Sequence, residues 1–299
     1  MKMHVLLTTV LLGVFLACDA PAQQPLAATA LRGRSYDPPR DTYAFVPNDG
    51  PHVRLADAFS PPPGFRRVDL EADAFGTWLR GLPLRADRTT VLSFRGEPLR
   101  SPSAAVVAMD VGSKNLQQCA DSAIRLHAEW LWAIRRTDDL AYHFTSGDEV
   151  HYPSWVLGER ISVDGAQVRR GEGPSRRDDH TSFRAWLDLV FMYAGTRSLA
   201  RDSVPVEPRE IAPGDFFVAP GSPGHAVVVL DVAKHRDGRR VALLGQGFMP
   251  AQEFHVLRSE GRHVVNGTWF LLPETADDVL RTPSWKPFAG ADARRFTAP

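Results

Sequence analysis

Two side chains that could act as a nucleophile and its base stand far apart in the sequence. Cys119 lies in the run Q-Q-C-A-D-S-A-I-R-L, and His225 lies in S-P-G-H-A-V-V-V-L. A thiol attacks a carbonyl carbon efficiently when an imidazole takes its proton, so the two residues together would form a nucleophilic pair. Two other interpretations stay open at this point: a buried cysteine that packs as a small apolar residue, and a histidine at the solvated end of a strand.

Such a pair needs a third group that orients the imidazole. Gln246, in A-L-L-G-Q-G, ends a strand that is predicted to form a hairpin with the strand of His225. Its amide oxygen could accept a hydrogen bond from the ring N–H, so Gln246 is the preferred candidate. The rival candidates are three polar residues near the same strands: Asp215, Asp231 and Gln252.

Stabilisation of a developing oxyanion is expected from the residues directly before the cysteine. Gln117 and Gln118 carry amide donors, and the backbone N–H groups at a helix start are free to donate. The predicted catalytic set is therefore Cys119, His225, Gln246 and Gln118. If the helix begins at residue 116 or later, its dipole also favours the thiolate.

The elements that must position these residues are helices first and strands afterwards. The longest helical pattern covers residues 114–136, with Ser113 as the expected N-cap. A second helix is predicted over 182–194, and the charged stretch 163–181 is expected to be an exposed loop. From residue 216 onwards, short apolar runs alternate with Gly, Pro and Asp turns, which is typical of antiparallel strands. This order of elements predicts an α+β fold.

The first residues have the pattern of an export signal, with a basic start and an apolar run that is too short to span a bilayer. Two cleavage sites are compatible with it. A lipobox would make Cys18 the lipidated first residue, and an A-x-A site would release the chain after residue 22. The lipobox is favoured because it explains the cysteine. We expect a signal peptide over 1–22, a flexible tether over 23–54 and a single α+β domain over 55–299, located in the cell envelope on a membrane anchor or in the periplasm.

Composition excludes several classes of function. The chain has 35 basic and 35 acidic residues and a net charge of +0, so no nucleic-acid partner is expected. It contains 2 Cys, and with Cys18 acylated or removed no internal disulfide can form. The histidines and cysteines lack metal-ligand spacing, and no phosphate-binding glycine loop is present. Neither a metal nor a cofactor is therefore expected.

Two stretches resemble a known group of enzymes. P-G-D-F-F-V followed by G-H-A-V-V-V-L resembles the catalytic-histidine strand of papain-like cell-wall cysteine peptidases and amidases. In that group a cysteine at a helix start, a histidine on a strand and a polar residue on the next strand follow in this order, which Cys119, His225 and Gln246 match. The resemblance implies a papain-like core, in which a central helix carrying Cys119 packs on an antiparallel sheet carrying His225.

Over nearly its full length the chain also resembles a family of exported bacterial proteins defined as a domain of unknown function. The shared phrases include L-Q-Q-C-A-D, P-G-D-F-F, S-P-G-H-A-V and M-P-A-Q-E. The hypothesis is an exported cysteine hydrolase or transferase that acts on an amide bond, with peptidoglycan peptides as the expected substrate. The alternative is a non-catalytic envelope lipoprotein that binds a glycan, a peptide or a partner protein. An enzyme should have a thiol pKa below the ordinary value of about 8.5, and a binding protein an inert thiol.

Overall fold

The computed structural model of this protein describes residue 31 and residues 33–297. The predicted signal peptide over 1–22, the candidate lipid-anchor residue Cys18 and the start of the predicted tether lie outside this part of the chain. Within it, we find no helix that has both the length and the apolar character needed to cross a bilayer.

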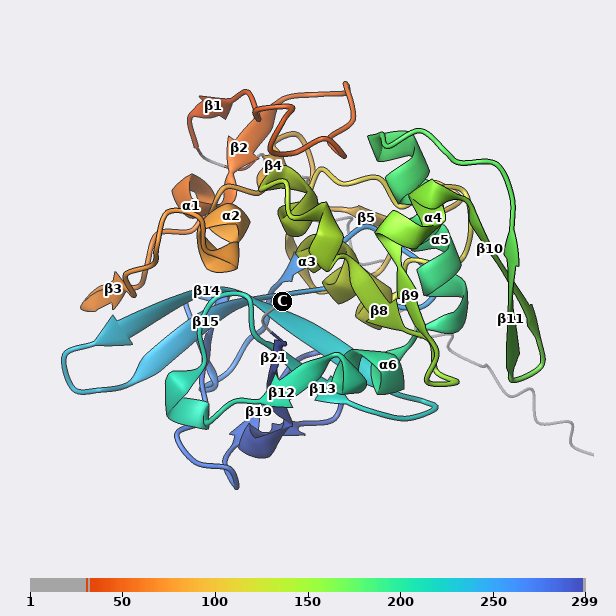
Figure 1. Cartoon of the computed structure of the whole chain (residues 1–299). Helices are drawn as coiled ribbons and strands as arrows, with labels where there is room; N and C mark the ends of the chain where they lie inside the picture. The colour runs from red at the N-terminus through yellow and green to blue at the C-terminus, as the bar shows by residue number, and fades with distance from the viewer. Residues whose placement is uncertain (1–30, 32, 298–299) are drawn as a thin grey trace, which may run out of the picture.

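An antiparallel sheet of ten strands forms the centre of the described part (Figure 1). Its main path runs β12-β21-β13-β14-β15-β16-β7, and β3, β17 and β18 pair with strands at its side. In that order the strands span Ser203–Pro205, Ala293–Phe296, Phe216–Ala219, His225–His235, Arg240–Gln246, His255–Leu257 and Ser103–Val106, and then Phe65–Arg67, Val264–Val265 and Trp269–Leu271. The long hairpin of β14 and β15 holds the sheet together.

Strand β14 is buried on both faces because its sequence is apolar at almost every position. On one face, Ala226, Val228 and Leu230 belong to a core cluster that also contains the helices. On the other face, Val227 and Val229 belong to a second cluster with the C-terminal segment. The sheet is therefore a layer between two hydrophobic clusters.

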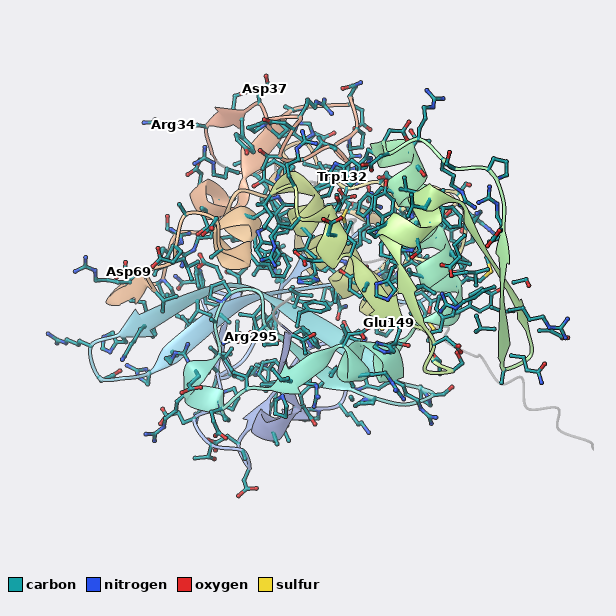
Figure 2. All side chains as sticks on the ribbon, in the orientation of Figure 1. Arg34, Asp37, Asp69, Trp132, Glu149 and Arg295 are labelled. Carbon is teal, nitrogen blue, oxygen red and sulfur yellow. The ribbon has the colours of Figure 1, made fainter. Side chains whose placement is uncertain are left out.

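Helices cover the first of these faces. α3 packs on β14, with α2 on one side of it and α5 and α6 on the other (Figure 1), and side chains fill the space between helices and sheet (Figure 2). The helices span Leu55–Ala58 (α1), Phe75–Arg80 (α2), Cys119–Ala133 (α3), Tyr152–Leu157 (α4), His180–Tyr193 (α5) and Thr196–Arg201 (α6), and the 3-10 turns span Thr137–Asp139 (η1), Pro208–Glu210 (η2) and Gly290–Asp292 (η3).

Small antiparallel sheets surround this core. They are β1 (Ser35–Tyr36), β2 (His52–Arg54) and β4 (Pro83–Arg85) in one sheet, and the pairs β5 (Val91–Leu92) with β6 (Pro98–Leu99), β8 (Ala141–His143) with β9 (Glu149–His151), β10 (Glu159–Asp164) with β11 (Gln167–Glu172), and β19 (Val279–Leu280) with β20 (Phe288–Ala289). The hairpin of β10 and β11 occupies much of the stretch that was expected to be a loop over 163–181. That expectation is wrong for residues 163–172, because the charged side chains lie on the outer surface of a two-stranded ribbon.

The predicted tether over 23–54 is packed against the domain in its second half. β1 and β2 pair with each other, and β2 pairs with β4. Tyr43, Phe45 and Val46 are buried in the core beside Trp78 of α2. Aromatic burial of this kind holds a segment in place although its composition is rich in Pro, Arg and Asp.

Helix α3 is shorter than the 114–136 pattern predicted. It begins at Cys119, and its N-cap is Gln118 rather than Ser113. The backbone N–H of Gln118 donates to the carboxylate of Asp121 over 3.0 Å, which closes the helix start. Cys119 therefore occupies the first helical position, where backbone N–H groups have no partner inside the helix.

The predicted papain-like core is wrong. Strands make up 30% of the structure and helices 23%, so the sheet dominates the architecture. In the part of the chain that the structure describes, no papain-like central helix is evident, and the fold is at most a mixed α+β arrangement. The sequence contains 24 Pro and 23 Gly, which end helices early and divide the chain into short strands and turns.

Candidate active site

The thiol of Cys119 lies where the start of α3 meets the start of β14. The backbone N–H groups of Ala226, Ala120 and Cys119 itself lie near its sulfur and act to lower the pKa of the thiol. Ala226 directly follows His225 in the chain. The fold thus brings the cysteine to the strand end that carries the histidine, although the two residues are far apart in sequence.

His225 is oriented by Gln246, the last residue of β15. The ring Nε2 lies 2.9 Å from the Gln246 Oε1, and the amide nitrogen of Gln246 donates to the hydroxyl of Ser284 over 3.0 Å. An amide oxygen only accepts, so the neutral ring carries its proton on Nε2 and offers Nδ1 as the base. Among the described residues, no hydrogen bond joins this ring to the sulfur of Cys119. They are connected instead through Ala226, whose backbone N–H lies near the sulfur and which directly follows His225 in the chain.

Aromatic rings enclose the imidazole of His225. The ring centroids of Phe248, Trp285 and Phe288 lie 5.0, 5.2 and 6.1 Å from that of His225. His225 and Gln246 are both buried. Rings packed at these distances restrict the rotation of the imidazole and exclude water from its hydrogen bond to the amide.

Two glycines allow the segments of the site to approach each other closely. A Cβ atom at Gly247 would lie 2.7 Å from the carbonyl oxygen of Gln118, so the end of β15 rests on the backbone of the helix start. A Cβ atom at Gly224 would lie 2.8 Å from the carbonyl oxygen of Ala219. Only a residue without a side chain fits at such distances.

Burial leaves both members of the pair uncharged at neutral pH. Burial raises the pKa of the Cys119 thiol to about 11, and the nearby carboxylate of Asp121 contributes to the increase. Burial lowers the pKa of His225 to about 4, although the hydrogen bond that the ring donates to Gln246 opposes the change. The pKa of the thiol therefore lies above the ordinary value, on the side that was expected of a binding protein with an inert thiol. The helix start and its N–H groups do favour the thiolate, but desolvation is the larger effect.

The two glutamines before Cys119 point to different places. Gln118 lines the pocket described below, and its side-chain amide makes no hydrogen bond among the described residues. Gln117 is buried, and its Oε1 accepts from Arg125 over 2.6 Å. Of the two residues, only Gln118 is placed to donate to a group bound beside the sulfur.

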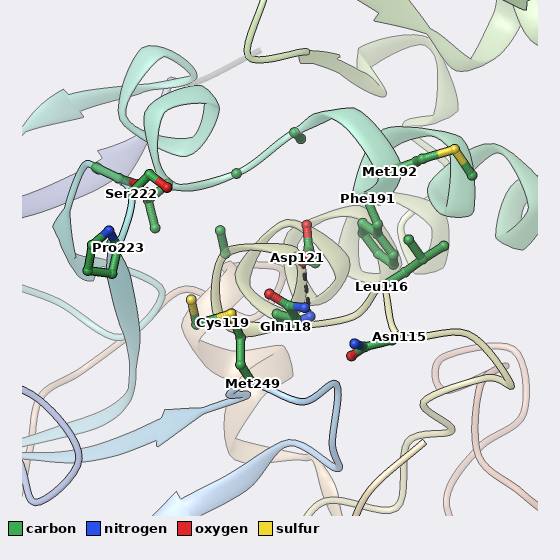
Figure 3. A pocket seen from close by; sticks show the side chains of 16 residues that line it. Asn115, Leu116, Gln118, Cys119, Asp121, Phe191, Met192, Ser222, Pro223 and Met249 are labelled. Carbon is green, nitrogen blue, oxygen red and sulfur yellow. Dashed lines mark hydrogen bonds between the residues drawn. The ribbon is translucent and has the colours of Figure 1, made fainter. Parts of the chain in front are cut away.

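A pocket of about 350 Å³ opens beside the thiol (Figure 3). Three segments form its walls: the start of α3 with the loop before it, the end of α5 with its link to α6, and the loop from Gly221 to Gly224 before β14. Met249 adds an apolar side chain at the edge. A cleft of this kind, between the ends of several elements, is a common location for a binding site.

Sequence reasoning missed one polar side chain of this pocket, Asp121. One carboxylate oxygen accepts from the backbone N–H of Gln118, and the other is buried without any hydrogen-bond partner in the described part of the chain. Burial raises the pKa of Asp121 to about 7. Its position, two residues after the cysteine in the first turn of the helix, was the available signal, but an acidic residue there is also an ordinary helix-start residue.

Gln246 forms the hydrogen bond to the His225 ring, and two of the three rival candidates pair with arginines instead. Asp231 accepts from Arg67 and Arg80, and Asp215 accepts from Arg295 over 2.6 Å. Gln252 forms an isolated backbone bridge with Ser93. Within the described residues, no group of three or more His, Cys, Asp or Glu side chains is arranged to hold a metal ion.

Comparison with known proteins gives one family match. No curated protein and no solved structure matches this chain. A family model matches residues 55–295, which include Cys119, His225 and Gln246. The chain therefore belongs to the family described as domain of unknown function (4846).

Proposed function

We propose that this protein is a cysteine hydrolase or transferase that acts on an amide bond, with Cys119 as the nucleophile and His225 as the general base. The observation that carries the proposal is the contact of the Cys119 sulfur with the backbone N–H of Ala226, next to a histidine that Gln246 orients. A nucleophile, a base and an orienting group are the components that acyl transfer requires. Cys119 lines the pocket, and the buried His225 directly follows Gly224, which lines it too.

The reaction starts from the uncharged pair. His225 Nδ1 takes the thiol proton as the sulfur attacks the carbonyl carbon, because a protonated thiol is a poor nucleophile and a neutral imidazole is a base. Collapse of the tetrahedral intermediate passes this proton to the departing amine and leaves a thioester on Cys119. Water or a second amine then attacks the thioester, with His225 again accepting a proton, and the thiol is released.

The negative charge of the tetrahedral intermediate develops at the start of α3. The backbone N–H of Cys119 and the free amide of Gln118 are the donors in this region. Oriented donors in a site shielded from water stabilise an oxyanion more strongly than water does. Gln246 acts differently: it holds the His225 ring in the tautomer that leaves Nδ1 free.

We further propose that the protein works in the cell envelope on peptidoglycan peptides. The support comes from the sequence: the pattern of an export signal over residues 1–22, the favoured lipobox interpretation of Cys18, which would anchor the chain in a membrane, and the resemblance to cell-wall peptidases around Cys119 and His225. Short peptides of the cell wall offer amide bonds that a pocket open on one side can reach.

A non-catalytic binding protein is the second candidate. The raised pKa of the Cys119 thiol favours it, since a thiol that stays protonated at neutral pH reacts slowly. In that case the pocket would hold a glycan, a peptide or a partner protein, and the histidine would serve only packing. Replacement of Cys119 by alanine would then leave binding unchanged.

The test is the release of fragments from purified peptidoglycan and from soluble cell-wall peptides, identified by mass spectrometry. We expect the native protein to cleave or transfer at an amide bond. Cys119→Ala should abolish the reaction, and His225→Ala should reduce it by a factor of about 1,000 or more. Asp138→Asn, at an exposed residue beyond the far end of α3, is the matched control. Equal product from Cys119→Ala and native protein would contradict the proposal.

A further inference from the structure

We propose that the pocket beside Cys119 binds a primary ammonium group of the substrate and that Asp121 is the residue that binds it. The inference rests on the proposed function, because it assigns the chemical class of the substrate for the same site. It goes beyond the proposed function because it names a residue that recognises the substrate, in addition to the nucleophile, the base and the orienting group.

The hydrogen bonding of Asp121 is incomplete. Oδ2 accepts from the Gln118 backbone N–H over 3.0 Å, as Figure 3 shows, whereas Oδ1 is buried and has no donor among the described residues. Asp121 is only 6% exposed. A buried carboxylate oxygen without a donor is costly, so the side chain is complementary to a ligand that brings N–H donors.

The negative charge of the pocket also favours a ligand with positively charged N–H donors. Among the described residues that line the pocket, Asp121 is the only Asp, Glu, Lys, Arg or His. Its pKa is influenced by burial and by backbone N–H groups and not by any cationic side chain. A carboxylate that lacks an internal counterion attracts a cationic ligand more strongly than a neutral one.

Part of the rim of the pocket is apolar. Met192 and Met249, which line the pocket from different segments, are 49% and 55% exposed. Methionine side chains are flexible and adapt to apolar groups of different shape. The substrate inferred from the pocket therefore carries an ammonium group and an apolar group close to the amide bond that is cleaved.

Binding of the ammonium group would also activate the nucleophile. The Asp121 carboxylate raises the pKa of the Cys119 thiol. A positive charge placed against that carboxylate offsets its effect on the sulfur, so the thiol becomes easier to deprotonate when such a substrate is bound. In the absence of substrate the thiol stays protonated and unreactive, which protects an exported protein from oxidation.

The charge preference of the pocket can be measured without knowing the substrate. Cys119 is treated with 2-aminoethyl methanethiosulfonate, which is cationic, and with propyl methanethiosulfonate, its neutral counterpart. In both cases the thiolate forms a mixed disulfide and methanesulfinate leaves. Mass spectrometry of the tryptic peptide 115–125 follows Cys119 separately from Cys18. The quantity compared is the ratio of the cationic to the neutral rate, at pH 8.

We expect Asp121→Asn to lower this ratio by about tenfold, in line with the loss of one screened charge interaction at close range. Asparagine can still accept from the Gln118 N–H, so the helix start is kept. Asp138→Asn, which removes the same charge from an exposed position, should leave the ratio unchanged. A ratio that is equal in native protein and Asp121→Asn would overturn the proposal.

Calorimetry distinguishes the two sources of such an ammonium group. L-alanine amide presents an α-ammonium group, and N-acetyl-lysine amide presents a side-chain ammonium group. We expect at least one of them to bind native protein and neither to bind Asp121→Asn; absence of binding by both to native protein would contradict the inference. Binding that depends on Asp121 without hydrolysis that depends on Cys119 would retain the ammonium site and exclude the hydrolase. Hydrolysis that depends on Cys119 but is unchanged by Asp121→Asn would retain the hydrolase and exclude the ammonium site.

Discussion

Two buried aspartates of this protein differ in what surrounds their carboxylates. Asp231 on β14 is completely buried, and its two oxygens accept from Arg67 of β3 at 2.5 Å and from Arg80 of α2 at 2.7 Å. Asp121 on α3 is nearly as buried, but among the described residues it has no cationic partner, and one of its oxygens has no donor. A buried carboxylate with full pairing joins elements of the fold, whereas one left incomplete beside a pocket is available for a ligand.

The comparison predicts a large loss of stability when Asp231 loses its charge. Asp231→Asn leaves Arg67 and Arg80 without their counterion and should lower the free energy of unfolding by about 4 kcal/mol. Urea-induced unfolding measures this value. The exposed control Asp138→Asn should change it by no more than about 0.5 kcal/mol. A loss below 1 kcal/mol for Asp231→Asn would show that the ion pairs do not stabilise the fold.

For Asp121 we expect instead an effect on the free energy of unfolding that changes with pH. Its pKa in the folded protein is about 7, against an ordinary value of 3.8. Between these pH values the unfolded chain loses the proton and the folded protein keeps it, so stability falls as the pH rises from about 4 to 7. Asp121→Asn removes this dependence and should gain about 2 kcal/mol relative to native protein between pH 4 and pH 8. Parallel pH profiles of unfolding for the two proteins would contradict the prediction.

The smallest expected effect concerns the reactivity of the thiol. Asp121→Asn removes a negative charge that raises the pKa of Cys119, so more thiolate is present at a given pH. Alkylation of Cys119 by iodoacetamide, a neutral reagent, should therefore be faster by about three- to tenfold at pH 8, since one pKa unit changes the thiolate fraction tenfold. Asp231→Asn should not show this acceleration while folded. A slower reaction for Asp121→Asn would mean that the carboxylate does not oppose ionisation of the thiol.

The parts of the site that could be predicted from sequence are those that local patterns determine. An apolar run after P-G places His225 at a strand start, the following hairpin ends at Gln246, and the hydrogen bond between the two side chains is present. Local sequence also placed Cys119 near the start of a helix, but it predicted that helix to begin at residue 114 rather than at residue 119. These features depend on turns and on residue periodicity, which are visible over a few residues.

The rest depends on tertiary contacts that no local pattern contains. The size of the sheet follows from pairings between distant segments, such as β16 with β7, and the papain-like core predicted by resemblance was wrong for this reason. The direction of Gln117 is determined by Arg125, and the raised thiol pKa by burial. Asp121 was missed because its role depends on the absence of a partner, which only the arrangement of its neighbours reveals.

The close contact of Gly247 with the Gln118 carbonyl has a consequence for the way this site tolerates change. At this contact the main chain at the end of β15 meets the main chain at the start of α3, with the hydroxyl of Ser122 beside them. We expect the single methyl group of Gly247→Ala to push the helix and the sheet apart and to abolish the reaction, while the protein still folds.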